Sequence, residues 1–433
     1  MNASRLEVAE VFRRYEADFT DKYGALLSVA QRRAMQAIMR CRTRELGGHR
    51  WRCDDCGHER IAYNSCRNRH CPKCQAQARA QWLAARAADL LPVPYFHVVF
   101  TLPEQLGPLA LQNPRVAYGL LFRAAWDTLR DVAANPKHLG AKIGALVVLH
   151  TWGQNLMHHP HVHCVVPGGG LSTDGSRWIA CRGARRDSRQ KEFFLPVRVL
   201  SRVFRGKFVA LLKRAHGQGQ LAFHGRLAPL VDPAVFERLL DTAVAREWIV
   251  YCKPPFGGPG QVLKYLARYT HRVAIANSRL VGIDDGQVRF RWKNYARGNQ
   301  WSTMCLPADE FMRRFLMHVL PAGFVRIRHF GLLCNRRRAG DLERCRQLLG
   351  ATVTPVQAVD NQDVLPTSVP MATAGDEAHN ELSAALTCPH CGKLTFRIVE
   401  DILPSGRTSP TRKSSSNRSR ASPRHRLALR GPP

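Results

Sequence analysis

Acidic residues are scarce in this chain of 433 residues, where 33 Asp and Glu stand against 65 Lys and Arg. The formal net charge of +32 favours a polyanionic partner, and nucleic acid is the usual one. Residues 402–433 contain eight of the basic side chains and no acid, which leaves +24 for the rest of the chain. The charge is therefore not confined to a basic tail, and the folded part should itself be basic.

Long apolar runs are also missing. The first residues are charged and amphipathic, so no secretion signal is expected. No run approaches the roughly 18–20 apolar residues of a membrane span. The fourteen cysteines do not read as disulfides, because six of them fall between Cys41 and Cys74 in short, metal-like spacings. A reducing cytoplasm with metal-bound thiolates fits this pattern best.

Hydrophobic periodicity predicts an α+β fold. Helices are expected over residues 4–40, 76–91, 114–133, 198–215 and 260–272. Strands are expected over residues 96–103, 144–153 and 161–166. The short connection between the second and third strands predicts an antiparallel pair, since a parallel pair needs a longer crossover. A hairpin should turn at Asp285-Gly286.

Two C-x-x-C pairs separated by fourteen residues predict one structural zinc ion, held by Cys53, Cys56, Cys71 and Cys74. Each pair places two thiolates on one tight turn, and two such turns complete the tetrahedral shell that Zn²⁺ prefers. Cys66 and His70 lie in the intervening loop and are possible extra ligands.

Basic side chains accompany this motif, namely Arg50, Arg52, Arg60, Arg67, Arg69 and Lys73. These side chains either contact phosphates or are solvated charges around a purely structural zinc site. A further C-x-x-C at Cys388 and Cys391 supplies half a site, which Cys334 and Cys345 could complete in a non-standard spacing. Without such partners it is a surface turn.

His161 and His163 are the most informative pair of residues in the sequence. They belong to the strand HVHCVV, so both imidazoles project from the same face of the strand. Two imidazoles and one further ligand can hold a divalent ion, which acts as a Lewis acid on a phosphate. Gln154 is the favoured third ligand, and His150, His158 and Asp174 are the alternatives. The His pair favours Mn²⁺ over Mg²⁺ in vitro, because Mg²⁺ prefers oxygen ligands. The triple glycine after this strand, Gly168–Gly170, would let a backbone segment pass close by.

Tyr265 and Tyr269 are four residues apart, so on a helix they share one face. Lys264, Arg268 and Arg272 accompany them. Nearby cations help to ionise a phenol and to hold a phosphate, because an ordinary phenol with a pKa near 10 is a poor nucleophile. Attack on DNA would leave a 5′-phosphotyrosine and a free 3′-OH, and the covalent link conserves the bond energy for rejoining. The alternative is an ordinary aromatic contact in a core.

Four blocks of sequence resemble the two-tyrosine HUH transposases of the insertion sequence 91 family. They are CRNRHCPKCQ (66–75), HTWGQNLMHHPHVHCVVPGGG (150–170), KYLARYTHRVAIANSRL (264–280) and RIRHFGLLCNRR (326–337). The resemblance covers residues 10–350 in order. It departs at Cys334, where a small residue such as Ala would be expected, and in the Ser/Arg-rich tail. Neither departure removes a proposed catalytic group.

The resemblance implies a transposase that nicks and rejoins single-stranded DNA at the ends of an insertion sequence, in rolling-circle-like transposition. His161 and His163 would bind Mg²⁺ or Mn²⁺, Tyr265 and Tyr269 would be alternating nucleophiles, and the cysteine segment would be a zinc-binding domain. Lys264, Arg268 and Arg272 would contact DNA. The protein would work in the bacterial cytoplasm at the nucleoid.

The implied fold is an N-terminal helical and zinc-knuckle part followed by an HUH-type antiparallel sheet with packed helices. We expect N-terminal helices over 1–48, a zinc-binding domain over 49–91 and a catalytic domain over 92–350. A linker with a C-x-x-C would follow over 351–401, and then a disordered basic tail over 402–433. Phe204 and Phe208 in the basic helix 198–215 would either stack on single-stranded DNA or face a core.

Other functions remain open from the sequence. A rolling-circle replication initiator or a relaxase of a plasmid or phage would use the same nicking chemistry. A non-catalytic zinc DNA-binding regulator would need neither tyrosine.

Overall fold

The computed structural model describes residues 6–181, 194–253, 261–262, 273–294, 298, 300–350, 387–393 and 395–405. Within these residues helices are combined with antiparallel sheets, which confirms the predicted α+β class. One sheet has five strands, two have three strands each, and β6 (Gly169–Leu171) pairs with β7 (Trp178–Ala180) in a small hairpin. Short 3₁₀ helices connect some of the elements: η1 (Gly24–Leu26), η2 (Arg44–Leu46), η3 (Glu104–Leu106), η4 (Gly225–Val231) and η5 (Asn277–Arg279).

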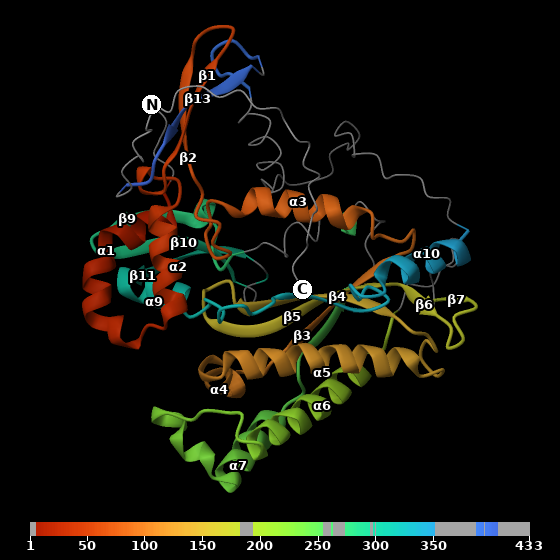
Figure 1. Ribbon diagram of the computed structural model, residues 1–433. Coiled ribbons are helices and arrows are strands. Elements are labelled where there is room, and N and C mark those ends of the chain that lie inside the picture. The colour runs from red at the N-terminus through yellow and green to blue at the C-terminus, as the bar shows by residue number, and fades with distance from the viewer. Residues whose placement is uncertain are drawn as a thin grey trace, which may run out of the picture.

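The five-stranded sheet has the order β12-β4-β5-β3-β8 and lies between two helical layers (Figure 1). Its strands are β3 (Tyr95–Thr101), β4 (Gly144–Trp152), β5 (His158–Pro167), β8 (Val250–Lys253) and β12 (Ile327–Gly331). All neighbouring strands are antiparallel, so the antiparallel pairing predicted for β4 and β5 is confirmed. Every residue of β4 is buried, which explains its nearly continuous apolar sequence.

One face of this sheet packs on the largest apolar core. The helices on this side are α4 (Gly107–Gln112), α5 (Pro114–Ala134), α6 (Val197–Gly217) and α7 (Pro233–Val244). Phe204 and Phe208 of α6 are buried in this core, where both rings contact Trp248. The suggestion that these two rings stack on DNA is therefore wrong, and the alternative of a core-facing aromatic stripe holds. The basic residues of α6 cover the outer side of an ordinary amphipathic helix.

The other face of the sheet is apolar at one end only. Here α3 (Gln75–Ala87) and α10 (Arg338–Leu348) lie over the sheet (Figure 1). The apolar cluster beneath them includes Tyr95, Leu146 and Val165, one residue from each of β3, β4 and β5. Because side chains alternate along a strand, residues two and four positions away from these share the same face. Those positions hold His97 and Val99 on β3, Val148 and His150 on β4, and His163 and His161 on β5.

The N-terminal helices pack against elements from much later in the chain. The predicted helical region 4–40 is divided into α1 (Val8–Tyr23) and α2 (Val29–Arg40), and α2 begins at a capping box formed by Ser28 and Gln31. Both helices share a core with α9 (Ala308–Leu316) and a three-stranded sheet of β9 (Leu280–Asp284), β10 (Gln287–Asn294) and β11 (Gln300–Pro307).

The predicted hairpin at Asp285-Gly286 is confirmed as the turn between β9 and β10. Both turn residues have positive φ angles, 47° and 71°, as a type I′ turn requires. The triple glycine also behaves as predicted, because a Cβ on Gly170 would collide with the backbone carbonyl of Lys142.

The third sheet joins segments that are far apart in sequence. Its order is β13-β1-β2, formed by β1 (Gly48–Cys53), β2 (Glu59–Tyr63) and β13 (Phe396–Ile402). The β1–β2 hairpin and β13 project together from the body of the molecule (Figure 1). The segment predicted as a linker with an isolated C-x-x-C thus contributes a strand next to the zinc-motif hairpin. The proposed domain boundaries remain predictions.

Candidate metal centres and nucleic-acid site

Three imidazoles gather on the face of the central sheet that carries α3 and α10, beyond the apolar cluster, where His150 and His163 are buried and His161 is partly exposed. His161 and His163 lie on β5, and His150 lies on β4 directly opposite His161 in the antiparallel register. One ring nitrogen from each of the three lies within 4.8 Å of the others. Ring centroids are 4.5 Å apart for His150 and His163 and 4.8 Å apart for His161 and His163. This spacing suits a metal ion bound by three imidazoles on one rigid surface.

The structure favours His150 as the third ligand. This residue was one of the alternatives to Gln154, which lies in the turn beyond the end of β4. His158 is engaged elsewhere, because its Nε2 lies 2.8 Å from the hydroxyl oxygen of Tyr118. Asp174 is held in the β6–β7 turn, where it accepts hydrogen bonds from the Ser176 hydroxyl and backbone. The strand register could have favoured His150, since it directly faces His161.

Two hydrogen bonds orient the imidazoles of β5. The Nδ1 of His161 donates to the backbone carbonyl of His159 at 2.7 Å. The Nδ1 of His163 lies 2.8 Å from Nε2 of His97, which is on the adjacent strand β3. Burial lowers the pKa of His97 to about 3, so this ring is neutral at physiological pH. An Nδ1 that donates its proton to such a bond, as in His161, leaves the Nε2 lone pair for a metal ion. Nothing in the sequence had marked His97.

The turn between β4 and β5 is held through its backbone carbonyls. Leu156 has a positive φ of 62°, which is unusual for a residue with a branched side chain. Three side chains donate hydrogen bonds to consecutive carbonyls of this turn: Arg279 to Gln154 at 2.6 Å, Arg314 to Asn155 at 3.3 Å and His318 to Leu156 at 3.0 Å. These contacts fix the ends of the two strands that carry the three imidazoles.

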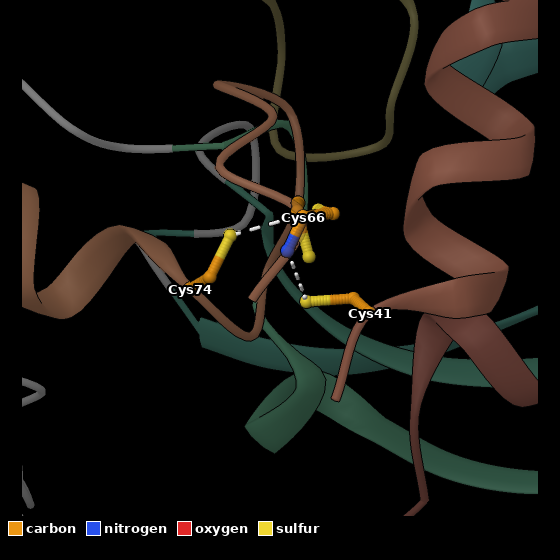
Figure 2. A group of neighbouring side chains, drawn as sticks. Cys41, Cys66 and Cys74 are labelled. Carbon is orange, nitrogen blue, oxygen red and sulfur yellow. Dashed lines mark hydrogen bonds between the residues drawn. The ribbon is translucent and has the colours of Figure 1, made fainter. Parts of the chain in front are cut away.

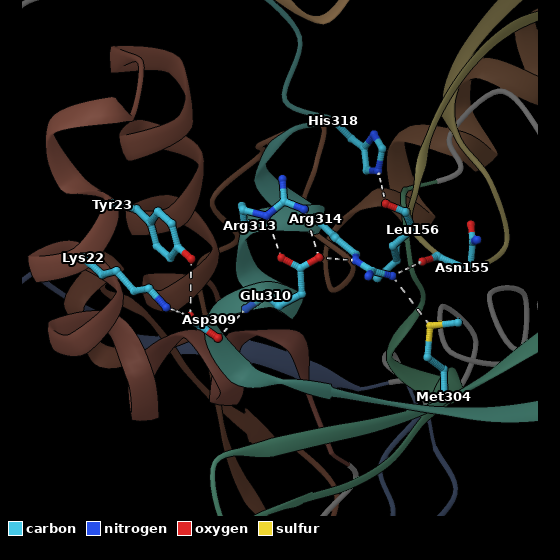
Figure 3. A network of polar contacts seen from close by, with 10 residues as sticks. All are labelled: Lys22, Tyr23, Asn155, Leu156, Met304, Asp309, Glu310, Arg313, Arg314 and His318. Carbon is cyan, nitrogen blue, oxygen red and sulfur yellow. Dashed lines mark hydrogen bonds and ion pairs between the residues drawn. The ribbon is translucent and has the colours of Figure 1, made fainter. Parts of the chain in front are cut away.

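Figure 3 shows how this turn is connected to the N-terminal helices through α9. Glu310 pairs with both Arg313 and Arg314, each at 2.6 Å, and Arg314 then reaches the turn. The adjacent residue Asp309 accepts a hydrogen bond from Lys22 of α1 at 2.6 Å. The N-terminal helices therefore support the histidine site indirectly.

The predicted nucleophiles Tyr265 and Tyr269 lie outside the described residues, as do Lys264, Arg268 and Arg272. Among the described residues, Tyr251 and Lys253 of β8 stand on the same face of the sheet as the histidines. Tyr251 is 51% exposed, and the Lys253 Nζ lies 6.0 Å from the centroid of its ring. An exposed aromatic ring beside a cation is a typical surface for single-stranded nucleic acid.

The cysteines of the predicted zinc site separate into two groups, so the predicted ligand set is wrong in its grouping. Cys71 and Cys74 lie with two thiols from the preceding segments, in the group Cys41, Cys66, Cys71 and Cys74. Figure 2 shows Cys41, Cys66 and Cys74 converging from the end of α2, the loop after β2 and the start of α3. The sulfurs of Cys66 and Cys74 are 3.7 Å apart.

Of the two possible extra ligands, Cys66 belongs to this group and His70 does not. The ring of His70 instead accepts a hydrogen bond from the backbone N–H of Leu320 at 3.4 Å. The sequence marks Cys41 only as one of six clustered cysteines, because it belongs to no C-x-x-C pair. Its position at the end of α2 brings it to the site.

Cys53 and Cys56 join the late C-x-x-C in the second group, which comprises Cys53, Cys56, Cys388 and Cys391. The idea that Cys334 and Cys345 complete the late pair is therefore wrong. Cys345 is instead buried in the apolar cluster beneath α3 and α10.

Most basic side chains near these cysteines form contacts with other residues of the protein. Arg50 pairs with Glu59 and Glu400, Arg52 with Glu59 and Lys73 with Glu7. The guanidinium of Arg60 lies 4.7 Å from the ring centroid of Phe396, and Arg69 donates to the carbonyls of Pro321 and Phe324. These contacts favour a purely structural zinc site over direct binding of phosphate by these basic residues.

The described part of the chain is thus an α+β protein with three places where side chains could hold a metal ion. Family models agree with this description. Residues 11–102 match the "Transposase zinc-binding domain", and residues 144–340 match the model described as "Putative transposase". No helix in the described ranges is both long and apolar enough to cross a membrane.

Curated relatives extend the match over most of the chain. The protein is 57% identical to "Putative transposase y4qJ" of Sinorhizobium fredii (strain NBRC 101917 / NGR234), over 82% of this chain and 86% of that one. It is 30% identical to the "Transposase for insertion sequence element IS801" of Pseudomonas savastanoi pv. phaseolicola, over 69% of each chain. The chain therefore belongs to the two-tyrosine transposases of the insertion sequence 91 type.

One solved structure was also matched, the conjugative relaxase TrwC in complex with OriT DNA in metal-free form. Its sequence identity is 14%, with 60% of this chain and 73% of that chain covered, and the TM-score is 0.21. A likeness at this TM-score does not establish a shared fold.

Proposed function

We propose that this transposase nicks and rejoins single-stranded DNA at the ends of its insertion sequence through a 5′-phosphotyrosine intermediate. The observation that carries the proposal is the group of His150, His161 and His163, with ring nitrogens within 4.8 Å of one another on adjacent strands. A divalent ion held there would supply Lewis-acid polarisation of the scissile phosphate. Three imidazoles favour Mn²⁺ over Mg²⁺ in vitro.

The chain's own residues would perform the transfer. The phenolate oxygen of Tyr265 or Tyr269 attacks phosphorus, an O–P bond to tyrosine forms, and the bond to the 3′-oxygen breaks. The departing 3′-oxygen takes up a proton, and the other strand end remains attached as a 5′-phosphotyrosine. Lys264, Arg268 and Arg272 would neutralise phosphates and favour the phenolate. Two tyrosines allow one 5′ end to be retained while the second attacks another junction.

Rejoining would reverse these bonds. A 3′-hydroxyl attacks the phosphotyrosine, the phenol leaves, and no nucleoside triphosphate is consumed. This chemistry would take place at DNA in the bacterial nucleoid and would drive rolling-circle-like transposition. The basic charge of the chain agrees with a DNA partner.

The test is incubation of the purified protein with labelled single-stranded oligonucleotides from the ends of the element, with Mg²⁺ or Mn²⁺. A covalent protein–DNA band is expected, and it should disappear in the double variant Tyr265→Phe, Tyr269→Phe. Tyr63→Phe is the matched control, because Tyr63 lies on β2 in a different sheet. His161→Ala and His163→Ala should abolish cleavage while leaving the fold intact.

Two results would overturn the proposal. If the double Phe variant still forms the covalent band, another nucleophile acts. If the wild-type protein binds these oligonucleotides and never cleaves them with either metal, a non-catalytic regulator becomes the better description.

A further inference from the structure

The second cysteine group extends beyond residues 11–102, the region matched by the zinc-binding family model, because Cys388 and Cys391 lie far outside it. We propose that Cys53, Cys56, Cys388 and Cys391 hold a second structural Zn²⁺, separate from an ion in the Cys41 group. This ion would fasten β13 to the β1–β2 hairpin. The proposal is independent of the nicking chemistry.

The two C-x-x-C turns have the same backbone conformation. In the first, the N–H of Gly57 donates to the carbonyl of Cys53 at 2.9 Å, and the N–H of Cys53 donates to the carbonyl of His58 at 2.9 Å. The second turn repeats both bonds. Gly392 donates to Cys388 and Cys388 donates to Lys393, each at 2.8 Å. Two copies of one turn, facing each other, are the usual construction of a four-cysteine zinc site.

Each turn also needs its glycine. Gly57 and Gly392 have φ angles of 71° and 73°, in the left-handed region that side chains disfavour. Both follow directly after the second cysteine of their pair. The sequence C-x-x-C-G therefore specifies the same knuckle at both places, although the intervening residues differ.

The sulfur positions fit a tetrahedral ion. Zn–S bonds of about 2.3 Å in a tetrahedron place the sulfurs about 3.8 Å apart. The Sγ atoms of Cys53 and Cys391 are 3.6 Å apart, and those of Cys56 and Cys388 are also 3.6 Å apart. Each short distance joins one knuckle to the other, so both turns contribute to the same centre.

The surrounding sheet has little else to stabilise it. None of the described residues of β1, β2 and β13 other than Cys53 is a buried apolar residue, and none belongs to the three apolar cores. The contacts between β1 and β13 are strand pairing and exposed ion pairs, such as Arg50 with Glu400 at 2.7 Å. Exposed pairs contribute little, and an isolated small sheet is marginal in water. A bound ion would supply the missing stabilisation.

The primary test is the zinc content of the full chain, purified with zinc under reducing conditions, dialysed against a mild chelator to remove ions held by the three imidazoles alone, and measured by mass spectrometry of the metal. Wild type should contain two ions per chain. Cys388→Ser with Cys391→Ser should contain one, and Cys66→Ser with Cys74→Ser should also contain one. The control Cys305→Ser with Cys334→Ser should retain two, because neither residue belongs to a cysteine group. One ion in wild type, or two in the Cys388/Cys391 variant, would overturn the proposal.

A second measurement follows the strand rather than the metal. Hydrogen exchange of residues 396–402 should be slow in the zinc-loaded protein and at least 10-fold faster in the Cys388/Cys391 variant. Amides of β4 serve as an internal reference, since they should stay protected if the body of the variant is folded. Unchanged protection of β13 with β4 intact would show that zinc does not hold the strand, and the proposal would fail.

Discussion

The Nε2 atom of His97 lies 2.8 Å from the Nδ1 atom of His163, so a buried imidazole on β3 supports one of the three clustered histidines. We predict that His97→Ala leaves the fold intact and weakens Mn²⁺ binding about 10–100-fold, as removal of such supporting partners usually does. Calorimetric titration with Mn²⁺ measures this. His97→Gln should recover part of the affinity, because its amide can still contact Nδ1.

The exposed His224 provides the matched control, since His224→Gln should bind Mn²⁺ like wild type. Equal Mn²⁺ affinity in His97→Ala and wild type would contradict the proposed positioning role.

Tyr251 should stack on a base of single-stranded DNA. Loss of a stacking ring typically costs about 1–3 kcal/mol per base, so Tyr251→Ala should weaken binding of a short oligonucleotide at least several-fold at fixed salt. Tyr251→Phe should bind normally. Fluorescence anisotropy checks this, with Ile249→Ala as a control for another exposed apolar side chain. If the alanine variant binds as tightly as wild type, DNA does not follow this edge of the sheet.

Phe204 should matter for stability and not directly for DNA. Its ring is fully buried and lies 4.9 Å from that of Phe100, measured between centroids. Phe204→Ala should lower the free energy of unfolding by about 3–5 kcal/mol through lost burial and a cavity. Denaturant titration measures the change, and Arg202→Ala on the exposed side of α6 should change it little. Normal stability with weakened DNA binding in Phe204→Ala would restore the stacking hypothesis.

Acidification should destabilise the protein partly through His318. Burial lowers the pKa of this ring to about 3 from its ordinary 6.5. The unfolded chain takes up the proton as the pH falls through about 6.5, whereas the folded ring stays neutral until about pH 3. The contribution of the neutral His318 ring to the free energy of unfolding is therefore complete above pH 6.5. Below pH 6.5 this contribution falls by up to about 1.4 kcal/mol per pH unit.

In His318→Gln the free energy of unfolding should fall less steeply with decreasing pH, by up to about 1.4 kcal/mol per pH unit, because glutamine does not titrate. Urea unfolding at pH 7 and pH 5 gives the comparison, with the partly exposed His138 replaced by Gln as control. Parallel pH profiles for His318→Gln and wild type would show that another group dominates.

Local sequence signals predicted the parts of the fold that depend on local interactions. The strands of the histidine site, their antiparallel pairing and the Asp285-Gly286 turn each follow from a few adjacent residues. The basic helix α6 was also located correctly, but its sequence could not decide between a core-facing and a DNA-facing aromatic stripe, since both use the same periodicity. The burial of Phe204 and Phe208 against Trp248 shows that the aromatic stripe faces the core.

The site residues that the sequence did not predict are brought together by packing between segments that are far apart in the chain. A C-x-x-C-G sequence identifies a knuckle, yet nothing in it specifies which other knuckle completes the shell. Cys56 and Cys388 are separated by 332 positions and meet only because β13 pairs with β1. His97 was missed for the same reason, since an isolated histidine in an apolar strand carries no sign of its neighbour on β5.

The pairing of β1 with β13 also sets an order of events during synthesis. Cys391 follows Cys53 by 338 residues, so at roughly 5–20 residues per second the hairpin waits about 17–68 s for its third strand to leave the ribosome. Through that interval two thiols of the early knuckle are exposed to oxidants and to competing metal ions. Shielding of those thiols, by a chaperone or by a loosely bound ion, would govern how much newly made protein matures correctly.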